Sequence, residues 1–203
     1  MSAPLAEKPG RVGLVACGAL AREIRAFTGQ PAMAHVETRF LPAKLHNTPS
    51  AIPAAVDAAL TALSPACARL FVAYADCGTA GGLDKVLSKH GASRLPGAHC
   101  YAVFAGLDAF DTLQDDEPGT FYLTDYLARQ FDPLVFGPLG LDRHPELRDA
   151  YFGNYTRLVH LVQSPDPGLD ARARDAARRL GLRYERIETG YGALTPFLAE
   201  ATA

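Results

Sequence analysis

The feature that most constrains the fold is an alternation of short apolar runs with segments of helical periodicity. The runs expected to form strands span 11–17, 35–41, 69–74, 97–103, 118–123, 158–162 and 183–187. The helices expected between and after them span 19–27, 50–63, 83–90, 104–113, 125–131, 143–151, 169–180 and 193–201. Such alternation is typical of βαβ units, whose strands lie parallel. The sequence therefore predicts an α/β fold: a doubly wound, mostly parallel sheet with helices on both faces, a Rossmann-like three-layer sandwich.

Length and linkers indicate a simple domain organisation. The chain has 203 residues, enough to bury one sizeable core. No repeat, low-complexity tract or long linker divides it, so we predict a single α/β domain over residues 1–203, with residues 1–10 flexible. The polar start has no apolar signal core, and no stretch is apolar enough to span a bilayer. We therefore expect a cytoplasmic protein without a membrane partner.

Charge and cysteine content limit the partners and the chemistry. A formal net charge of -2 argues against a nucleic-acid partner, because phosphate binding needs a basic surplus. The cytoplasm keeps thiols reduced. The four cysteines are therefore expected to be small core residues, metal ligands or reactive thiols rather than a disulfide framework. The sequence does not determine the oligomeric state.

Three cysteines share one position relative to the expected strands. Cys17 ends the first strand, Cys77 follows the third, and Cys100 lies at the end of the fourth. In open α/β sheets, ligands bind beyond the carboxyl ends of the strands, where the strand order reverses. We therefore expect these thiols to converge. Cys67 precedes a strand, at the opposite edge, and is expected to be structural.

Converging thiols point to a metal site. Zinc takes sulfur and nitrogen ligands in tetrahedral geometry, which predicts zinc bound by Cys17, Cys77 and Cys100, with His46 and His99 as the candidate fourth ligands. His46 follows the second strand, whereas His99 is adjacent to Cys100, and neighbouring strand residues point to opposite faces. An iron–sulfur cluster held by the three cysteines is an alternative, although no compact Cys-x-x-Cys run is present. A further alternative is a metal-free enzyme with one low-pKa cysteine and His46 or His99 as base.

The loop 76–82, Asp-Cys-Gly-Thr-Ala-Gly-Gly, suggests a second kind of site. Its backbone amides precede an expected helix and would cradle a cofactor phosphate. It lacks the lysine of a P-loop and the glycine order of a dinucleotide fold. The candidate cofactor-binding residues are Gly78, Thr79, Gly81 and Gly82.

The order of motifs resembles the domain-of-unknown-function family 1638, over roughly residues 12–162. The matching segments are 16–20 with Glu23, 45–49, 74–78 with Gly81 and Gly82, 99–100, 118–123 and 154–155. The residues matching Cys17, His46, Cys77 and Cys100 belong to the family's recurring motifs. The family more often has one residue between the histidine and cysteine that here are adjacent at 99–100, which favours His46 as the fourth ligand.

The resemblance also implies a metabolic setting. Members of the family often look like companions of corrinoid-dependent methyl-transfer systems that demethylate methylamines or betaines. The chain would then be a metal-thiolate protein of one-carbon metabolism. Its partner would be a small-molecule methyl donor or a corrinoid protein, the corrinoid being reached through that partner. Two roles stay open: a metal-dependent methyltransferase, or an accessory protein that carries a metal or cofactor without catalysis of its own.

Overall fold

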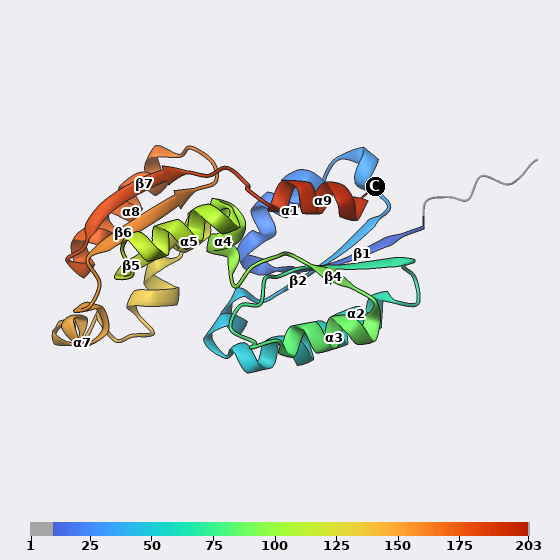
Figure 1. Cartoon of the computed structure of the whole chain (residues 1–203), viewed down its shortest axis with the longest axis horizontal. Helices are drawn as coiled ribbons and strands as arrows, with labels where there is room; N and C mark the ends of the chain where they lie inside the picture. Colours follow the sequence, from blue (N-terminus) through green and yellow to red (C-terminus); the bar gives the residue numbers. More distant parts are fainter. Residues whose placement is uncertain (1–9, 203) are drawn as a thin grey trace, which may run out of the picture. The chain divides into compact units, whose positions relative to one another are not determined.

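The computed structural model describes residues 10–202, which divide into two compact units (Figure 1). The first unit runs to His99 and resumes at Leu194; the second is Cys100–Ala193. Each contains its own parallel sheet, here called sheet A and sheet B, where the sequence predicted a single sheet. The single domain over 1–203 stays a prediction, and the flexible start predicted at 1–10 lies, apart from Gly10, outside the described residues.

Sheet A forms the first unit. It contains β1 (Val12–Cys17), β2 (Val36–Leu41), β3 (Arg69–Ala73) and β4 (Ser93–Arg94), in the order β2-β1-β3-β4. All its pairings are parallel. The chain passes from β1 to β2 on one side and returns to β3 on the other, so the strand order reverses between β1 and β3. This is where ligands bind in open α/β sheets.

Helices cover both faces of sheet A. They are α1 (Ala21–Thr28), α2 (Ile52–Leu63), α3 (Gly82–His90) and α9 (Leu194–Thr202), with 3-10 turns at Gly18–Leu20, Pro31–Met33, Ala43–Asn47 and Pro49–Ala51. Figure 1 shows α1 and α9 on one face and α2 and α3 on the other. In α2, Ile52, Val56, Leu60 and Leu63 are buried at helical spacing, because this is the face that the helix turns to the sheet.

Sheet B forms the second unit, with β5 (Thr120–Thr124), β6 (Arg157–Val162) and β7 (Arg183–Glu188) in sequence order and parallel. The helices are α4 (Cys100–Ala105), α5 (Leu107–Asp116), α6 (Asp125–Arg129), α7 (Arg148–Phe152) and α8 (Pro167–Leu180), with a π turn at Asp132–Phe136 and a 3-10 turn at Pro145–Leu147. Leu158 packs with residues of α6 and α8, and Val159 with residues of α4 and α5. Neighbouring residues of β6 thus face the helix layers on opposite sides of sheet B.

The predicted fold class is confirmed, since both sheets are parallel and flanked by helices. The strand expected at 97–103 was wrong. The fourth strand is Ser93–Arg94, and Cys100–Ala105 is helix α4. A short apolar run such as 101–105 fits a buried strand and a buried helix equally well, so periodicity alone does not decide between them.

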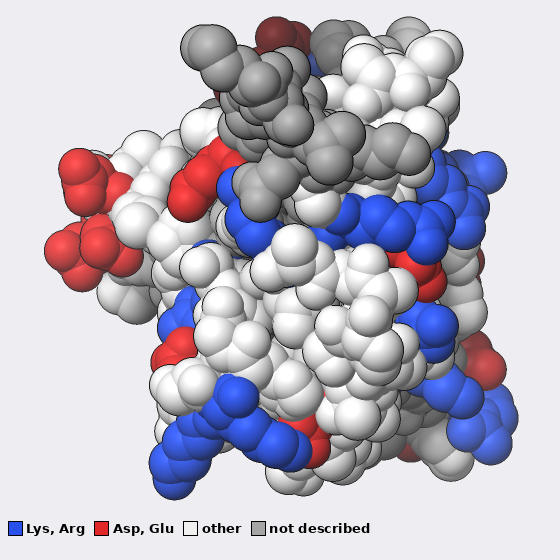
Figure 2. All heavy atoms as spheres, turned by 90° about the vertical axis from the view of Figure 1, so that its right-hand side faces the viewer, with Lys and Arg blue, Asp and Glu red and all other residues white. Residues whose placement is uncertain are grey.

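The surface carries charges of both signs. On the face shown in Figure 2, basic and acidic side chains are interspersed among uncharged residues. Such mixing accords with the formal net charge of -2. Within residues 10–202, no helix has both the length and the apolar character that a membrane crossing requires.

One surface carboxylate gives the stability of the chain a predictable dependence on pH. Asp170, in the first turn of α8, accepts a hydrogen bond from the Tyr184 hydroxyl and one from Arg174 Nε at 3.0 Å. The Tyr184 hydroxyl is the main cause that holds the pKa of Asp170 below its ordinary value of 3.8. A carboxyl with a lowered pKa stabilises the fold above its ordinary pKa, and the contribution is lost as the pH falls through the folded value.

We therefore expect Asp170→Asn to lower the free energy of unfolding at neutral pH by about 1 kcal/mol or less, since the carboxylate is partly exposed. The difference from wild type should shrink in urea titrations as the pH falls below the ordinary pKa of 3.8 and through the lowered pKa of Asp170, because the wild-type carboxyl is then protonated as well. Tyr184→Phe should shrink the neutral-pH difference. A deficit of equal size at neutral and at acidic pH would contradict this account.

Candidate thiol site

Two of the predicted thiols lie at the strand-order reversal of sheet A. Cys17 is the last residue of β1, and Cys77 follows β3, the adjacent parallel strand. The thiols are near enough that negative charge on Cys17 raises the pKa of Cys77. Cys67 is buried before β3, at the opposite edge, as the sequence predicted. The site is therefore built on Cys17 and Cys77.

Cys17 occupies a prepared position at the start of a helical segment. It is the N-cap of the turn Gly18–Leu20, and its Sγ accepts a hydrogen bond from the Ala19 amide at 3.3 Å. Burial raises the pKa of the thiol, and the Ala19 amide opposes that shift. A Cβ on Gly18 would lie 2.9 Å from the Leu41 carbonyl oxygen, so only glycine lets the end of β2 approach this close. The amide is thus already in place to stabilise a thiolate.

Cys77 sits in an unusual backbone conformation. Its φ is 52°, in the left-handed region, which costs a non-glycine residue about 1–2 kcal/mol. The loop before Cys100 holds it there: the Cys77 amide donates to the Ala98 carbonyl at 2.7 Å, and the Asp76 amide to the Gly97 carbonyl at 3.1 Å. Burial, and secondarily the charge of Cys17, raise the pKa of Cys77 to about 12. Without a cation, this thiol is protonated at neutral pH.

The loop after Cys77 is closed by its own carboxylate. Asp76 accepts hydrogen bonds from the Thr79 hydroxyl at 2.8 Å, the Gly81 amide at 3.0 Å and the Ala80 amide at 3.2 Å. The Gly81 amide is the main cause that holds the pKa of Asp76 below its usual value. An internal anion thus occupies donors that the sequence assigned to a cofactor phosphate. The candidate phosphate-binding residues Gly78, Thr79, Gly81 and Gly82 gain no support from this geometry.

Tyr74, which the sequence analysis missed as a site residue, lies beside both thiols. It follows β3 and is 1% exposed. Burial raises its pKa well above the usual range, and the charges of Cys17 and Cys77 add to the shift. Its hydroxyl lies near Cys17, but no group in the described part of the chain gives it a fully formed hydrogen bond. The one signal in the sequence was its place at the end of a buried strand, directly ahead of Ala75, Asp76 and Cys77.

His46 reaches the same tyrosine from the end of β2. It lies in the 3-10 turn Ala43–Asn47, and its ring stacks on that of Tyr74 with centroids 5.9 Å apart and planes 9° apart. Nδ1 lies 2.9 Å from the Ala43 carbonyl oxygen. Because a carbonyl only accepts, Nδ1 carries a proton, and in a neutral ring the lone pair is then on Nε2. Ligating histidines commonly have this arrangement, with one nitrogen on a backbone carbonyl and the other on the metal.

Cys100, the remaining predicted ligand, is not part of the first unit. Cys100 is the first residue of α4, in the second unit, and does not end a strand of sheet A as predicted. His99 is the last residue of the first unit, and burial lowers its pKa. Between residues 10 and 202, no three or more histidine, cysteine, aspartate or glutamate side chains are grouped so as to hold a metal ion. Cys17, Cys77 and His46 thus share an edge without forming a closed ligand set.

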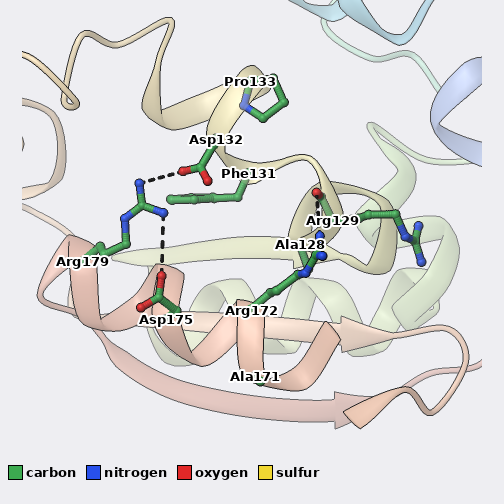
Figure 3. Close-up of a pocket in the computed structure, with 9 residues that line it drawn as sticks. All are labelled: Ala128, Arg129, Phe131, Asp132, Pro133, Ala171, Arg172, Asp175 and Arg179. Carbon is green, nitrogen blue, oxygen red and sulfur yellow. Dashed lines mark hydrogen bonds and ion pairs between the residues drawn. The ribbon is translucent and has the colours of Figure 1, made fainter. Parts of the chain in front are cut away.

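A hollow in the second unit offers different chemistry. It measures about 490 Å³ and lies between α8 and the segment that follows α6 (Figure 3). Arg179 reaches across it to Asp132 at 2.6 Å and to Asp175 at 3.7 Å, with its guanidinium over the Phe136 ring at 3.8 Å from the centroid. The Arg179 guanidinium is therefore already paired with two carboxylates and an aromatic ring. We interpret the residues around this hollow as structural contacts between α8 and the segment after α6.

The fold and the site define a class: Rossmann-like α/β proteins with two thiols at the strand-order reversal. The sequence profile of a family described as protein of unknown function, DUF1638, matches residues 40–198. That range covers most of the chain, so the chain belongs to this family, and it includes His46, Cys77 and Cys100. Searches of curated proteins and of solved structures give no significant match.

Proposed function

We propose that the chain is a metal-thiolate protein that serves methyl transfer in one-carbon metabolism. Cys17 and Cys77 are proposed as thiolate ligands of zinc and His46 as its nitrogen ligand, whereas Cys100 stays a prediction from the sequence. The observation that carries the proposal is that Cys17, Cys77 and His46 all lie at the carboxyl ends of strands of sheet A. A buried thiol, Cys17, and a partly buried one, Cys77, stand at the strand-order reversal, near the His46 imidazole, whose Nδ1 faces a backbone carbonyl.

The state of the thiols favours a metal over a metal-free nucleophile. A cysteine that attacks without a metal is activated by a lowered pKa. Burial raises the pKa of both Cys17 and Cys77 instead. A divalent cation reverses this preference, because it displaces thiol protons and supplies the missing positive charge. The Ala19 amide on Cys17 and the Ala43 carbonyl on His46 are the supporting contacts such ligands use.

The number of sulfurs favours zinc over an iron–sulfur cluster. A cluster with one open iron needs three cysteines, and the first unit brings two to this edge. Zinc accepts two sulfurs with a nitrogen and leaves a fourth position for substrate or water. Since the donors do not form a closed set, the His46 side chain must move toward the thiols, or a further ligand must complete the site.

The chain's own residues have definable roles around such an ion. Zinc would supply Lewis acidity toward a bound thiol or water. The Tyr74 hydroxyl is buried and able to donate a hydrogen bond to an oxygen or sulfur of whatever binds beside the thiols. Stacking on Tyr74 fixes the plane of the His46 ring. Burial keeps bulk water away from the sulfurs, which strengthens any charge interaction there.

Methyl transfer rests on the family resemblance together with this chemistry, because methyl-transfer reactions commonly use a metal-activated thiolate. The proposed partners are a small-molecule methyl donor, such as a methylamine or betaine, and a corrinoid protein in the cytoplasm. The chain would act either as a metal-dependent methyltransferase or as its accessory protein. No nucleic-acid or membrane partner is proposed.

Metal analysis tests the proposal. Full-length protein purified without air or chelator should contain about one zinc per chain, the stoichiometry of a single site. Cys17→Ser and Cys77→Ser should each lower the zinc affinity by about tenfold or more, since each removes a ligand. Cys67→Ser is the matched control, a buried cysteine at the opposite edge, and should keep its zinc. Elemental analysis and competition with a chromogenic chelator give both quantities.

The same preparations test the metabolic assignment. Zinc-loaded protein, mixed with a methylamine or betaine and with free cobalamin or a corrinoid partner kept reduced as Co(I), should form methylcobalamin and release the demethylated amine, a change visible in the absorption spectrum. Loss of this activity in Cys77→Ser, and not in Cys67→Ser, would support a methyltransferase. Zinc binding without methyl transfer under any combination would support the accessory role. Protein that binds no zinc, or whose binding is unchanged in both site variants, would refute the metal-thiolate proposal.

A further inference from the structure

The outer edge of sheet A presents an unpaired row of backbone groups. β2 is the edge strand next to β1, and the Val12 amide donates to the His35 carbonyl at 3.0 Å. Successive residues of a strand direct their backbone groups to opposite sides. The groups directed at β1 are therefore those of His35, Glu37, Arg39 and Leu41, and those directed outward are of Val36, Thr38 and Phe40. The outward groups form no backbone hydrogen bond to another segment within residues 10–202.

The sequence of this edge is complementary to itself. If a second β2 lies antiparallel with a two-fold axis at Thr38, Thr38 faces Thr38 and Val36 faces Phe40. These are the residues with outward amides and carbonyls, so each such pair exchanges both of its hydrogen bonds. Between them lie the non-hydrogen-bonded positions, where Glu37 of one copy faces Arg39 of the other. Side chains come closest at such positions, so opposite charges there stabilise the pairing.

The charges also select this register. A two-fold axis at position 37 would place two Glu37 side chains opposite each other, and an axis at position 39 would do the same with Arg39. Like charges directly opposite each other destabilise a strand pair. Within one chain these two residues are only loosely engaged, since Glu37 lies 3.8 Å from Arg39 and 4.0 Å from Arg11. Their charges are therefore available to a partner.

Two further observations agree with this axis. The Thr38 hydroxyl is buried and has no hydrogen-bond partner among the residues described, and at the axis it would meet a second Thr38 hydroxyl. Beside the edge lies a hollow of about 460 Å³, lined by Arg39 and Leu41 of β2 and by small alanines of α2. It gives room for the partner's Glu37 next to Arg39.

We infer that a second copy of this chain binds here: two β2 strands pair antiparallel about Thr38 and join the two A sheets into one. Pairing satisfies an edge that natural proteins otherwise cover or blunt. The interface is isologous, with the same patch used on both copies. It stands independently of the thiol site and of any metal.

Charge reversal tests the pairing. Sedimentation equilibrium of the full chain should give twice the 21.7 kDa mass of one chain at micromolar concentration. Glu37→Arg and Arg39→Glu should each weaken dimerisation by about tenfold or more, because attraction becomes repulsion at both symmetric positions. An equimolar mixture of the two variants should form a heterodimer, since both positions of one chain are then basic and face acidic positions of the other. The double exchange in one chain should restore the homodimer.

Two controls separate pairing from folding. Thr38→Pro removes only an outward amide, so it should abolish dimerisation while far-UV circular dichroism stays that of the wild type. Arg11→Ala removes one of the two intrachain contacts of Glu37 and should leave the dimer intact. Wild type that sediments as a monomer, or a dimer that persists in both single charge variants, would overturn the inference.

Discussion

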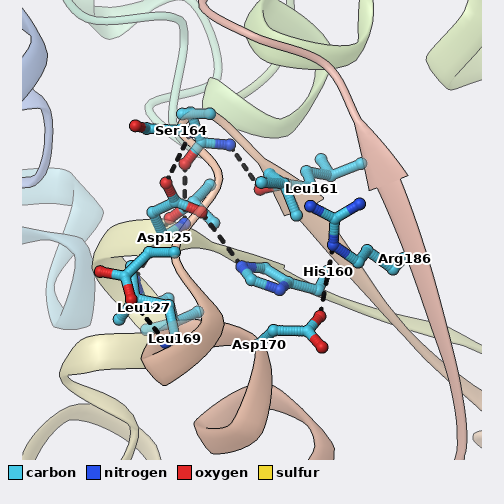
Figure 4. A network of polar contacts seen from close by, with 12 residues as sticks. Asp125, Leu127, His160, Leu161, Ser164, Leu169, Asp170 and Arg186 are labelled. Carbon is cyan, nitrogen blue, oxygen red and sulfur yellow. Dashed lines mark hydrogen bonds and ion pairs between the residues drawn. The ribbon is translucent and has the colours of Figure 1, made fainter.

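Replacing Asp125 by alanine is expected to lower the free energy of unfolding by about 3 kcal/mol or more, because it leaves buried donors without an acceptor. Asp125 opens α6 and is 3% exposed. Its Oδ1 lies 3.1 Å from His160 Nε2 in the middle of β6, and its Oδ2 accepts the Ser164 amide at 2.9 Å (Figure 4). One carboxylate thus joins the strand, the loop after it and the neighbouring helix.

The surroundings of Asp125 leave no easy replacement for it. His160 is 1% exposed, and its other nitrogen lies 3.4 Å from the Tyr184 hydroxyl. The Asp125 amide donates to the Gln163 side chain at 2.7 Å. A buried donor left without a partner costs about 1–3 kcal/mol, and the alanine variant removes the acceptor of the buried His160 ring and of the partly buried Ser164 amide. Because these buried polar groups are all paired in the native protein, removing any one of them is expected to lower the free energy of unfolding.

Asp166→Ala is the matched control for this prediction. Asp166 is an aspartate at the start of the other helix on the same end of sheet B; it caps α8, accepting the Gly168 amide at 2.9 Å and the Leu169 amide at 3.3 Å. It is only partly buried, so its loss should cost about 1 kcal/mol, the usual effect of removing an N-cap. Urea titration of both variants gives the comparison. Equal losses would mean that the buried contacts of Asp125 contribute no more than an ordinary, partly exposed helix cap.

Local patterns in the sequence predict the elements of sheet A well, because those elements follow simple rules. The run at 69–74 is uniformly apolar and forms the buried strand β3, and the periodicity at 50–63 places the inner face of α2. The run at 97–103 fails because its structure depends on packing. The run overlaps helix α4 of the second unit, in which residues 102–104 are buried, and no local pattern indicates this packing.

For the candidate site, too, some features follow from local sequence patterns and others depend on packing. The positions of Cys17 and Cys77 relative to their strands predict their shared edge, since parallel strands end together. The loop at 78–82 looks like a phosphate cradle because its glycines allow the left-handed conformation. Only the coordinates show that Asp76 already occupies its donors. Tyr74 escapes notice because nothing in a sequence tells that a hydroxyl is buried beside two thiols.

At the opposite end of sheet B, Arg157→Ala is expected to lower the free energy of unfolding by about 3–5 kcal/mol, as when one partner of a buried ion pair is removed. Arg157 opens β6 and is 6% exposed. Its guanidinium binds Glu185 at 3.0 Å, Thr120 at 2.7 Å and the Leu113 carbonyl at 2.9 Å. One buried side chain therefore links β5, β6, β7 and the end of α5.

Arg183 provides the comparison that decides whether pairing or burial matters. It binds the same two glutamates as Arg157, Glu117 at 2.6 Å and Glu185 at 3.2 Å, but its side chain is 57% exposed. Exposed ion pairs contribute about 0–1 kcal/mol, so Arg183→Ala should stay within that range. Urea titration at neutral pH in low and high salt measures both variants. Because salt screens exposed charges and spares buried ones, the deficit of Arg157→Ala should persist in high salt. If both variants lose the same stability and both losses fade with salt, the arginines act only through surface charge.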